Sequence, residues 1–194
     1  MSARAQQLRY VASRLNMSFS EEDEYGLLGL LEDFQLFNAG RRQKISNILR
    51  KEDSFGDFDL RIFDFEYTRG KKRVHRQSVF FVQSKELSLP QLLMKPESIF
   101  LKIGKLLGVQ DINFEEHPEF SKSYLLQGED EELIRNVMDE RVLKFFSVEK
   151  GWYVEGIGYY LIVYKRYKLL GPRSLTRFYQ KGLDIHQLLK SDWQ

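Results

Sequence analysis

The sequence predicts an α+β fold in which antiparallel sheet, built from β-hairpins, is packed by about four helices. The strongest evidence is a pair of strand-like runs over 58–68 and 74–84, separated by the turn Arg69-Gly70-Lys71-Lys72. A second pair of short runs within 152–165 has the same character. Apolar residues at helical spacing predict the helices, over 3–15, 96–107, 129–146 and 172–189.

The first 40 residues predict a helix followed by turns. Ala5, Leu8, Ala12 and Leu15 recur at helical spacing, which gives the segment one apolar face. The acidic run at 21–24 then indicates a solvated turn or the first turn of a helix. Asn38-Ala39-Gly40 is typical of a further turn.

An antiparallel meander is expected from about 43 to 87, with a first strand over 45–50. In the next strand the apolar residues change face near Ile62, from the side of Phe58 to the side of Phe65. Such a change indicates either a β-bulge or a strand that is covered on both sides.

The second half predicts two helices around a short strand. Leu89-Pro90 ends the sheet segment, and Pro96 suits the first position of a helix that Gly108 closes. A strand is expected over 120–126. Carboxylates at 129–132 then favour a helix start, because they complement the positive end of the helix dipole.

The last segment predicts a hairpin and a C-terminal helix. The hairpin turns at Gly156-Ile157-Gly158, and Pro172 with Ser174 begins the helix. No linker or internal repeat stands out, so we expect one domain over 1–194, with the helix and acidic turn of 1–24 as its most loosely packed part.

Composition excludes several classes of function. The chain has 194 residues, no cysteine and a net charge of +2, from 30 Lys and Arg against 28 Asp and Glu. Thiolate metal sites, disulfides and cysteine nucleophiles are therefore excluded, and no global field favours nucleic acid. Phosphate-binding glycine loops and serine-nucleophile motifs are absent, so we expect no cofactor and no catalytic residue of a familiar type.

Metal binding has little support in the sequence. His75, His117 and His186 are scattered without ligand spacing, which favours structural or surface roles. The segment 111–119 is rich in oxygen and nitrogen donors but lacks the order of a calcium loop. A solvated acidic loop is the favoured interpretation, with metal binding as the alternative.

The best local signal is a basic hairpin tip. Positive charge gathers there within eight residues, and the candidate anion-binding surface comprises Arg69, Lys71, Lys72, Arg73 and Arg76. A second basic group lies over 165–173. The alternative interpretation is a solvated tip whose charges keep the hairpin soluble and discourage edge pairing.

The chain from Phe37 to Leu189 resembles a family of bacterial proteins of unknown function. The resemblance rests on Phe37-Asn38-Ala39-Gly40-Arg41, Ile45-Ser46-Asn47-Ile48-Leu49, Phe63-Asp64-Phe65-Glu66-Tyr67-Thr68, Gln77-Ser78-Val79, 107–114, 117–120, 124–130 and Trp152-Tyr153-Val154-Glu155. It implies an α+β domain, which in many such proteins is tethered to a membrane, and it assigns no site residue.

Two function classes follow from these observations. The preferred one is a non-catalytic interaction or scaffold module of a bacterial cytoplasm, near the inner membrane, with a protein or an anionic membrane surface as partner. The alternative is a small-ligand binder or enzyme whose site is assembled from dispersed residues, such as Asp64, Glu66, Tyr67, Arg76 and Tyr164. A weaker alternative is nonspecific binding of lipid or nucleic acid through 69–76. A pocket lined by converging polar groups with shifted pKa values would favour the second class.

Overall fold

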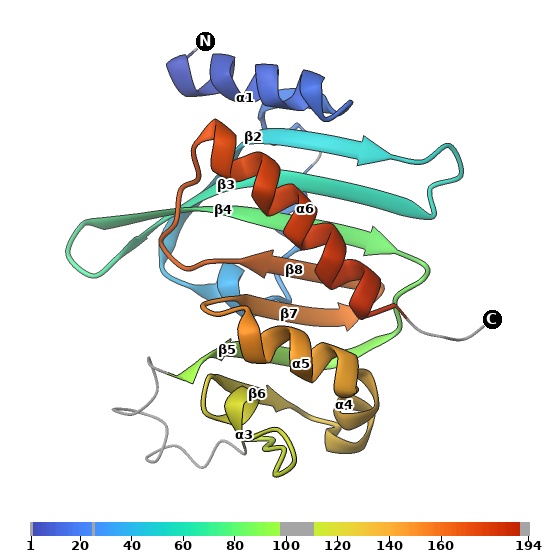
Figure 1. Ribbon diagram of the computed structural model, residues 1–194. Coiled ribbons are helices and arrows are strands. Elements are labelled where there is room, and N and C mark those ends of the chain that lie inside the picture. Colours follow the sequence, from blue (N-terminus) through green and yellow to red (C-terminus); the bar gives the residue numbers. More distant parts are fainter. Residues whose placement is uncertain (1, 25, 98–110, 191–194) are drawn as a thin grey trace.

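The protein is an eight-stranded antiparallel sheet with helices on both faces (Figure 1). The computed structural model describes residues 2–24, 26–97 and 111–190. Strand order is β1-β2-β3-β4-β8-β7-β5-β6. The strands are β1 Ser18–Glu22, β2 Arg41–Glu52, β3 Phe58–Arg69, β4 Arg73–Ser84, β5 Leu89–Pro96, β6 Tyr124–Gly128, β7 Tyr153–Gly158 and β8 Tyr160–Tyr164. This confirms the predicted α+β class.

Six α-helices and one 3₁₀ helix lie within the described residues. They are α1 Ala3–Arg14, α2 Leu27–Leu30, η1 Gln35–Asn38 (the 3₁₀ helix), α3 Pro118–Ser121, α4 Glu131–Val137, α5 Glu140–Val148 and α6 Pro172–Leu188. The longest, α6, has 17 residues, and none of the described helices could span a bilayer.

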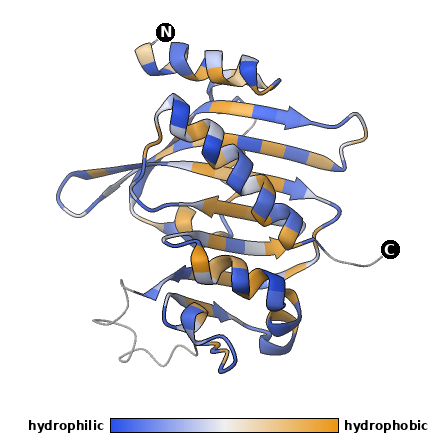
Figure 2. Ribbon diagram, viewed as in Figure 1, coloured by the Kyte–Doolittle hydropathy of each residue, from blue (hydrophilic) through white to orange (hydrophobic). Residues whose placement is uncertain are grey.

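The sheet is covered on both faces, which gives the protein two separate apolar cores. Leu60, Ile62 and Phe80 point to the face that α1 and α6 cover. Phe63 and Phe65, on the alternate positions of β3, pack beneath α2 and η1. Figure 2 shows the resulting orange bands along the strands. Double coverage, one of the two interpretations of the face change near Ile62, is therefore observed. Strand β3 pairs with β4 in unbroken register, and the irregularity opposite Ile62 and Asp64 lies in β2, between Ser46 and Leu49.

Helix α1 is attached to the sheet by packing and by an ion pair. Leu8 and Ala12 are each only 1% exposed. The guanidinium of Arg4 donates from Nε to Asp64 Oδ2 (2.5 Å) and from Nη2 to Oδ1 (2.7 Å). The same guanidinium donates to the carbonyl oxygen of Leu170, ahead of α6. Residues at the two ends of the chain thus meet at β3.

Two expectations for segments between helices are wrong. The acidic run at 21–24 is in part the edge strand β1, because Ser18 to Glu22 pair with β2. Leu89-Pro90 does not end the sheet: it begins β5, which pairs with both β6 and β7. Proline is tolerated there because it opens the strand, where its missing N–H costs no ladder bond.

The segment after β5 also differs from expectation. Pro96 ends β5 instead of beginning a helix, and the rest of the expected helix lies outside the described residues. The strand expected over 120–126 begins at Tyr124, after α3. The helix expected over 129–146 is broken at Asp139, whose side chain accepts from Val142 N and caps α5.

Gly182 allows α6 to approach the sheet closely. A Cβ at this position would lie 2.2 Å from the ring of Phe80, which is fully buried in β4. The ring cannot retreat, because the opposite face of the sheet is filled by the second core. Glycine is therefore required by packing at the centre of α6.

Substitution Gly182→Ala should lower the free energy of unfolding by about 1–3 kcal/mol, because the added methyl group overpacks α6 against Phe80. Gly29→Ala in α2 is the matched control, since a Cβ there meets no atom within 4 Å. That variant should be neutral or slightly stabilising. Chemical denaturation of both variants measures the effect, and equal stability of the two would contradict the packing argument.

Candidate ligand-binding cleft

A cleft of about 460 Å³ lies at the end of the sheet where the β3–β4 hairpin turns. We call it the tyrosine cleft, because three tyrosines from three strands form its walls. Its lining residues are Gln35, Leu36, Asn38, Ala39, Gly40, Tyr67, Arg69, Lys95, Tyr153, Tyr164 and Arg166. They come from η1 and from the ends of β3, β5, β7 and β8, so the cleft exists only in the assembled sheet.

Strand register places the tyrosines together. Tyr153 and Tyr164 are direct partners in the β7–β8 pair, and their rings stack with centroids 4.9 Å apart. Tyr67 lies two strands away from β8, beyond β4. All three side chains point to the face that η1 covers, because each occupies the same alternation as the second core.

The hydroxyl group of Tyr153 makes no well-formed hydrogen bond among the described residues, although the guanidinium of Arg166 lies close enough to interact with it. The side chain is buried, with 5% exposure, and burial raises its pKa although Arg166 partly opposes that rise. An unpartnered buried hydroxyl group costs about 1–3 kcal/mol. Tyr153 lines the cleft next to Arg166, so its hydroxyl group still lacks an acceptor at the place where a ligand would lie.

Three cationic side chains line the same cleft: Arg69, Lys95 and Arg166. Burial lowers the pKa of Lys95, the charge of Arg166 lowers it further, and Glu155 opposes both. No carboxylate is among the described lining residues. The cleft therefore combines positive potential with hydroxyl donors, which is the chemistry of an anion site.

Gly40 forms part of the wall and could not be replaced by another residue without strain. Its φ is +75°, in the left-handed region, and a Cβ would lie 2.5 Å from the carbonyl oxygen of Thr68. It would also lie 2.7 Å from the ring of Tyr67. The turn at 38–40 thus brings backbone directly against the tyrosine wall.

Glu155 lies beneath the cleft and holds η1 in place. Its carboxylate accepts from the backbone N–H of Gln35 (2.6 Å), the N–H of Leu36 (3.2 Å) and the hydroxyl group of Tyr164 (2.9 Å). No side chain of η1 itself caps that helix, so β7 supplies the cap. Burial raises the pKa of Glu155 to about 7, although these three donors and Lys95 all oppose the rise.

A second cleft, of about 450 Å³, lies on the other side of η1. It shares Gln35 and Asn38 with the tyrosine cleft and is lined also by Gln91, Gln127 and Glu155. Its lining is dominated by carboxamide and carboxylate groups, in contrast to the cationic tyrosine cleft. The strap of η1 and its Glu155 cap separate the two.

The dispersed residues of the sequence hypothesis divide between the two faces of the sheet. Tyr67 and Tyr164 line the tyrosine cleft. Asp64 instead accepts from Arg4 on the α1 side, and Glu66 pairs with the guanidinium of Arg76 at 2.5 Å. Alternation along β3 explains the division, since residues 64 and 66 point opposite to residue 67.

The buried carboxylate of Asp59 on β3 is paired with arginine side chains. Burial alone would raise the pKa of Asp59, but hydrogen bonds from Arg50 and Arg61 outweigh it and hold that pKa below its usual range. Asp57, at the exposed turn before β3, pairs with Lys85. These carboxylates stabilise the strand and line neither of the two clefts.

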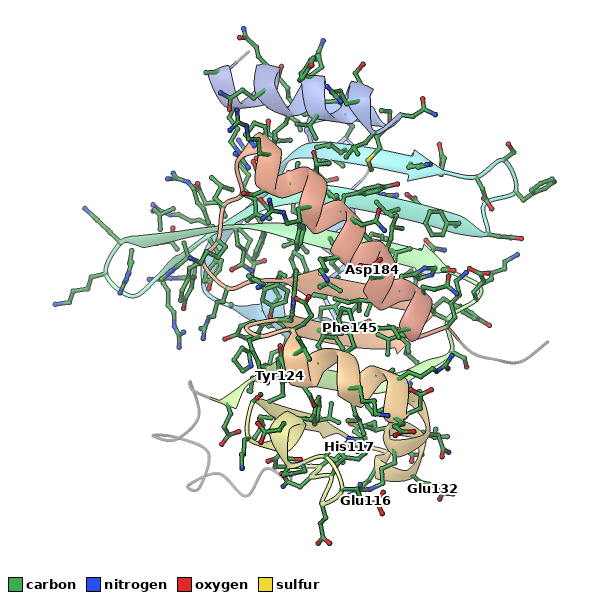
Figure 3. All side chains as sticks on the ribbon, in the orientation of Figure 1. Glu116, His117, Tyr124, Glu132, Phe145 and Asp184 are labelled. Atoms are coloured by element: carbon green, nitrogen blue, oxygen red, sulfur yellow. The ribbon has the colours of Figure 1, made fainter. Side chains whose placement is uncertain are left out.

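The three histidines lie far apart. The ring of His75 lies between Tyr67, on which it stacks, and Tyr167, which it meets at a tilt, with centroids 5.2 and 4.5 Å away. His186 is buried beside Phe58, and burial lowers its pKa to about 4. His117 lies next to Glu116 at the end of the molecule opposite α1 (Figure 3). Within the described residues, no three His, Asp or Glu side chains are arranged to hold a metal ion.

The basic residues of the sequence hypothesis occupy different environments. Lys71, Lys72 and Arg73 are exposed at the hairpin tip, while Arg69 reaches into the cleft wall. Arg76 is paired with Glu66. The sequence did not indicate Lys95, Tyr153 or Glu155 as site residues. Lys95 and Tyr153 line the tyrosine cleft, and Glu155 lies beneath it. A glutamate inside the apolar run of β7 was the one available signal.

Comparisons with known proteins identify the fold. A scan of protein-family models finds no match, and neither does a search of curated proteins. Among solved structures, the mycobacterial trehalose monomycolate transport factor A is similar, with a TM-score of 0.66 over 100% of both chains. The two sequences are 10% identical. At that identity the likeness shows a shared fold and carries no function to this chain.

Ionisation of Glu155 should make stability depend on pH. Its pKa is about 7 in the folded protein against an ordinary value of 4.5, so the folded state binds the proton more tightly. Its stabilising contribution is therefore complete below pH 4.5 and is lost as the pH rises through 7. The full change is on the order of 3 kcal/mol.

The variant Glu155→Gln has no ionisable group at this position. Comparing it with the original protein therefore isolates the titration of Glu155 from that of other groups. The difference in unfolding free energy between the original protein and the variant should decrease from pH 4.5 to pH 8. Urea denaturation at a series of pH values measures it. A difference that does not vary with pH would show that Glu155 has an ordinary pKa.

Proposed function

We propose that the protein binds a small organic anion in the tyrosine cleft, through a carboxylate or phosphate group of the ligand. The observation that carries the proposal is the meeting of two guanidinium groups that pair with no described carboxylate and the buried hydroxyl group of Tyr153, which lies beside one of them. Neither Arg69 nor Arg166 makes an ion pair with a described carboxylate, and the hydroxyl group of Tyr153 lies in the same lining.

The chemistry of these groups suits an oxyanion. A guanidinium donates two parallel hydrogen bonds to a carboxylate or phosphate, and such charge-assisted bonds are about twice as strong as neutral ones. The hydroxyl group of Tyr153 would gain the acceptor that it lacks. Burial lowers the pKa of Lys95, and a ligand anion would add to the charge of Glu155 in favouring the protonated ammonium group.

The walls of the cleft suit the remainder of such a ligand. Stacked rings of Tyr153 and Tyr164 present a flat surface, and Leu36 and Ala39 add apolar area. The volume of about 460 Å³ falls within the range of small-molecule sites. An anion with an apolar or planar body is therefore the class that fits.

This proposal favours the ligand-binding class over the interaction or scaffold module that the sequence alone favoured. The criterion that separates them is a concavity with converging polar groups and shifted pKa values. The tyrosine cleft supplies it, with pKa values raised by burial at Tyr67 and Tyr153 and lowered at Lys95. The two classes remain compatible where a ligand controls an interaction.

Substitution Tyr153→Phe should have opposite effects on stability and on binding. Without ligand, the variant should be as stable as the original protein or up to about 1–3 kcal/mol more stable, because it removes an unpartnered buried hydroxyl group. Its affinity for phenyl phosphate should fall by about tenfold, since one hydrogen bond to the anion is lost. Thermal denaturation and isothermal titration calorimetry measure the two effects.

A purely structural tyrosine would give another result, because its loss would lower stability and leave any anion affinity unchanged. That outcome would contradict the assigned role of the hydroxyl group.

Substitution Arg166→Gln should weaken binding of phenyl phosphate and benzoate by at least tenfold, because charged hydrogen bonds contribute about 1.5–3 kcal/mol each. Arg177→Gln is the matched control: it removes the same charge from an exposed position on α6, outside the cleft. It should bind like the original protein. Absence of saturable binding to phenyl phosphate, benzoate or inorganic phosphate at constant ionic strength would refute the proposed function.

A further inference from the structure

Three basic segments that are distant in sequence meet at the hairpin end of the sheet. Arg41 pairs with Thr68, which places the start of β2 beside the end of β3. The backbone N–H of Ser78 donates to the carbonyl oxygen of Lys168, and that of Tyr167 donates to the side chain of Gln77. The segment after β8 is thereby fixed against β4. We call residues 41–43, 69–75 and 165–168 together the basic end.

The basic end contains no carboxylate. Its nine cationic residues are Arg41, Arg42, Arg69, Lys71, Lys72, Arg73, Lys165, Arg166 and Lys168. The whole chain has 30 Lys and Arg against 28 Asp and Glu, so the remaining residues have 21 cations against 28 carboxylates. A nearly neutral sequence thus folds into a molecule with one strongly positive end and an acidic remainder.

Most of these charges are available to a partner. Arg41, Arg42, Lys71, Lys72 and Arg73 are exposed, and none of them forms an ion pair with a described carboxylate. In contrast, Arg76, which lies further along β4, is paired with Glu66. The β3–β4 hairpin, whose tip contains Lys71, Lys72 and Arg73, projects beyond the rest of the sheet (Figure 1).

Exposed apolar and aromatic side chains accompany the charges. Val74 and Tyr167 are each 45% exposed. The ring of Tyr167 contacts that of His75 at a tilt, and the guanidinium of Arg166 lies 4.7 Å from its centroid. Basic residues mixed with an aliphatic side chain and a tyrosine are the composition that binds the interface of an anionic bilayer.

We propose that the basic end docks on the surface of an anionic lipid bilayer. The charge distribution sets the orientation, because the acidic remainder is repelled from an anionic surface and leaves the hairpin tip as the first contact. Nucleic acid would satisfy the charges but not the exposed aliphatic side chain of Val74, so the bilayer is the partner that the observations favour.

This inference goes beyond the proposed function, because the tip residues that carry docking do not line the tyrosine cleft. The two features meet at Arg69 and Arg166, which belong both to the basic end and to the cleft lining. Docking would therefore carry the cleft to the membrane surface. Separate variants can test the two, since Lys71, Lys72 and Arg73 lie outside the cleft.

The experiment measures cosedimentation of the protein with vesicles of phosphatidylglycerol and phosphatidylcholine in equal amounts, and with vesicles of phosphatidylcholine alone. Each basic residue near an anionic surface contributes roughly a fivefold gain in binding. The variant Lys71→Gln/Lys72→Gln/Arg73→Gln should therefore bind the anionic vesicles on the order of 100-fold more weakly than the original protein at low salt.

A matched control has the same change in charge elsewhere. Lys122→Gln/Lys144→Gln/Arg177→Gln also replaces two lysines and one arginine, all exposed on α5, on α6 or after α3. It should bind the anionic vesicles as the original protein does. Equal losses in the two triple variants, or equal binding to both kinds of vesicle, would overturn the inference.

Two further measurements separate this inference from the proposed function. The tip variant should keep its affinity for phenyl phosphate, while Arg166→Gln, which loses that affinity, should weaken vesicle binding by no more than about fivefold. Failure of the cleft to bind any anion would leave docking intact, and failure of docking would leave the cleft intact. A competition with duplex DNA tests the other partner. If DNA displaces the protein from the vesicles when the concentration of DNA phosphates is far below that of the anionic lipid head groups, nucleic acid is the partner and the bilayer proposal is wrong.

Discussion

The pairing of β3 with β4 is the interaction on which the rest of the structure depends. Twelve consecutive residue pairs join these strands without a bulge, and apolar side chains leave both of their faces. Because neither face can be left in water, each needs its own covering layer. Helices α1 and α6 supply one, while α2 and η1 supply the other. The two cores, the clefts and the projecting hairpin all follow from this central pair.

Helix η1 is capped by a side chain from another element, and the candidate site lies beside it. A short 3₁₀ helix with no cap of its own is held by the carboxylate of Glu155, from beneath. That carboxylate is buried, so its pKa rises to about 7 even with three donors around it. Holding the strap therefore has an energetic cost at neutral pH. In return, η1 bridges the strand ends and leaves a cleft on each side.

The positive end of the molecule has a similar origin in the sheet. Antiparallel connections bring the end of β3, the start of β2 and the end of β8 to the same end of the sheet, although these segments are far apart in the chain. Each is basic by itself, and only together do they form a surface without carboxylates. Ring contacts from Tyr67 to His75 and from His75 to Tyr167 join that surface to the cleft. The ligand site and the docking surface are thus neighbours because the same strand ends build both.

Local patterns in the sequence determined the α+β class, the β3–β4 hairpin, the first and last helices and the exposed basic tip, because each depends on residues close together in the chain. The change of apolar face along β3 indicated either a β-bulge or double coverage, and only the structure decided between them. The edge strand β1, the strand β5 and the break at Asp139 were not predictable, since pairing and capping partners outweighed local propensity there. Only the tertiary structure decided the cleft, because Lys95, Tyr153 and Arg166 converge through strand order, which one sequence does not encode locally.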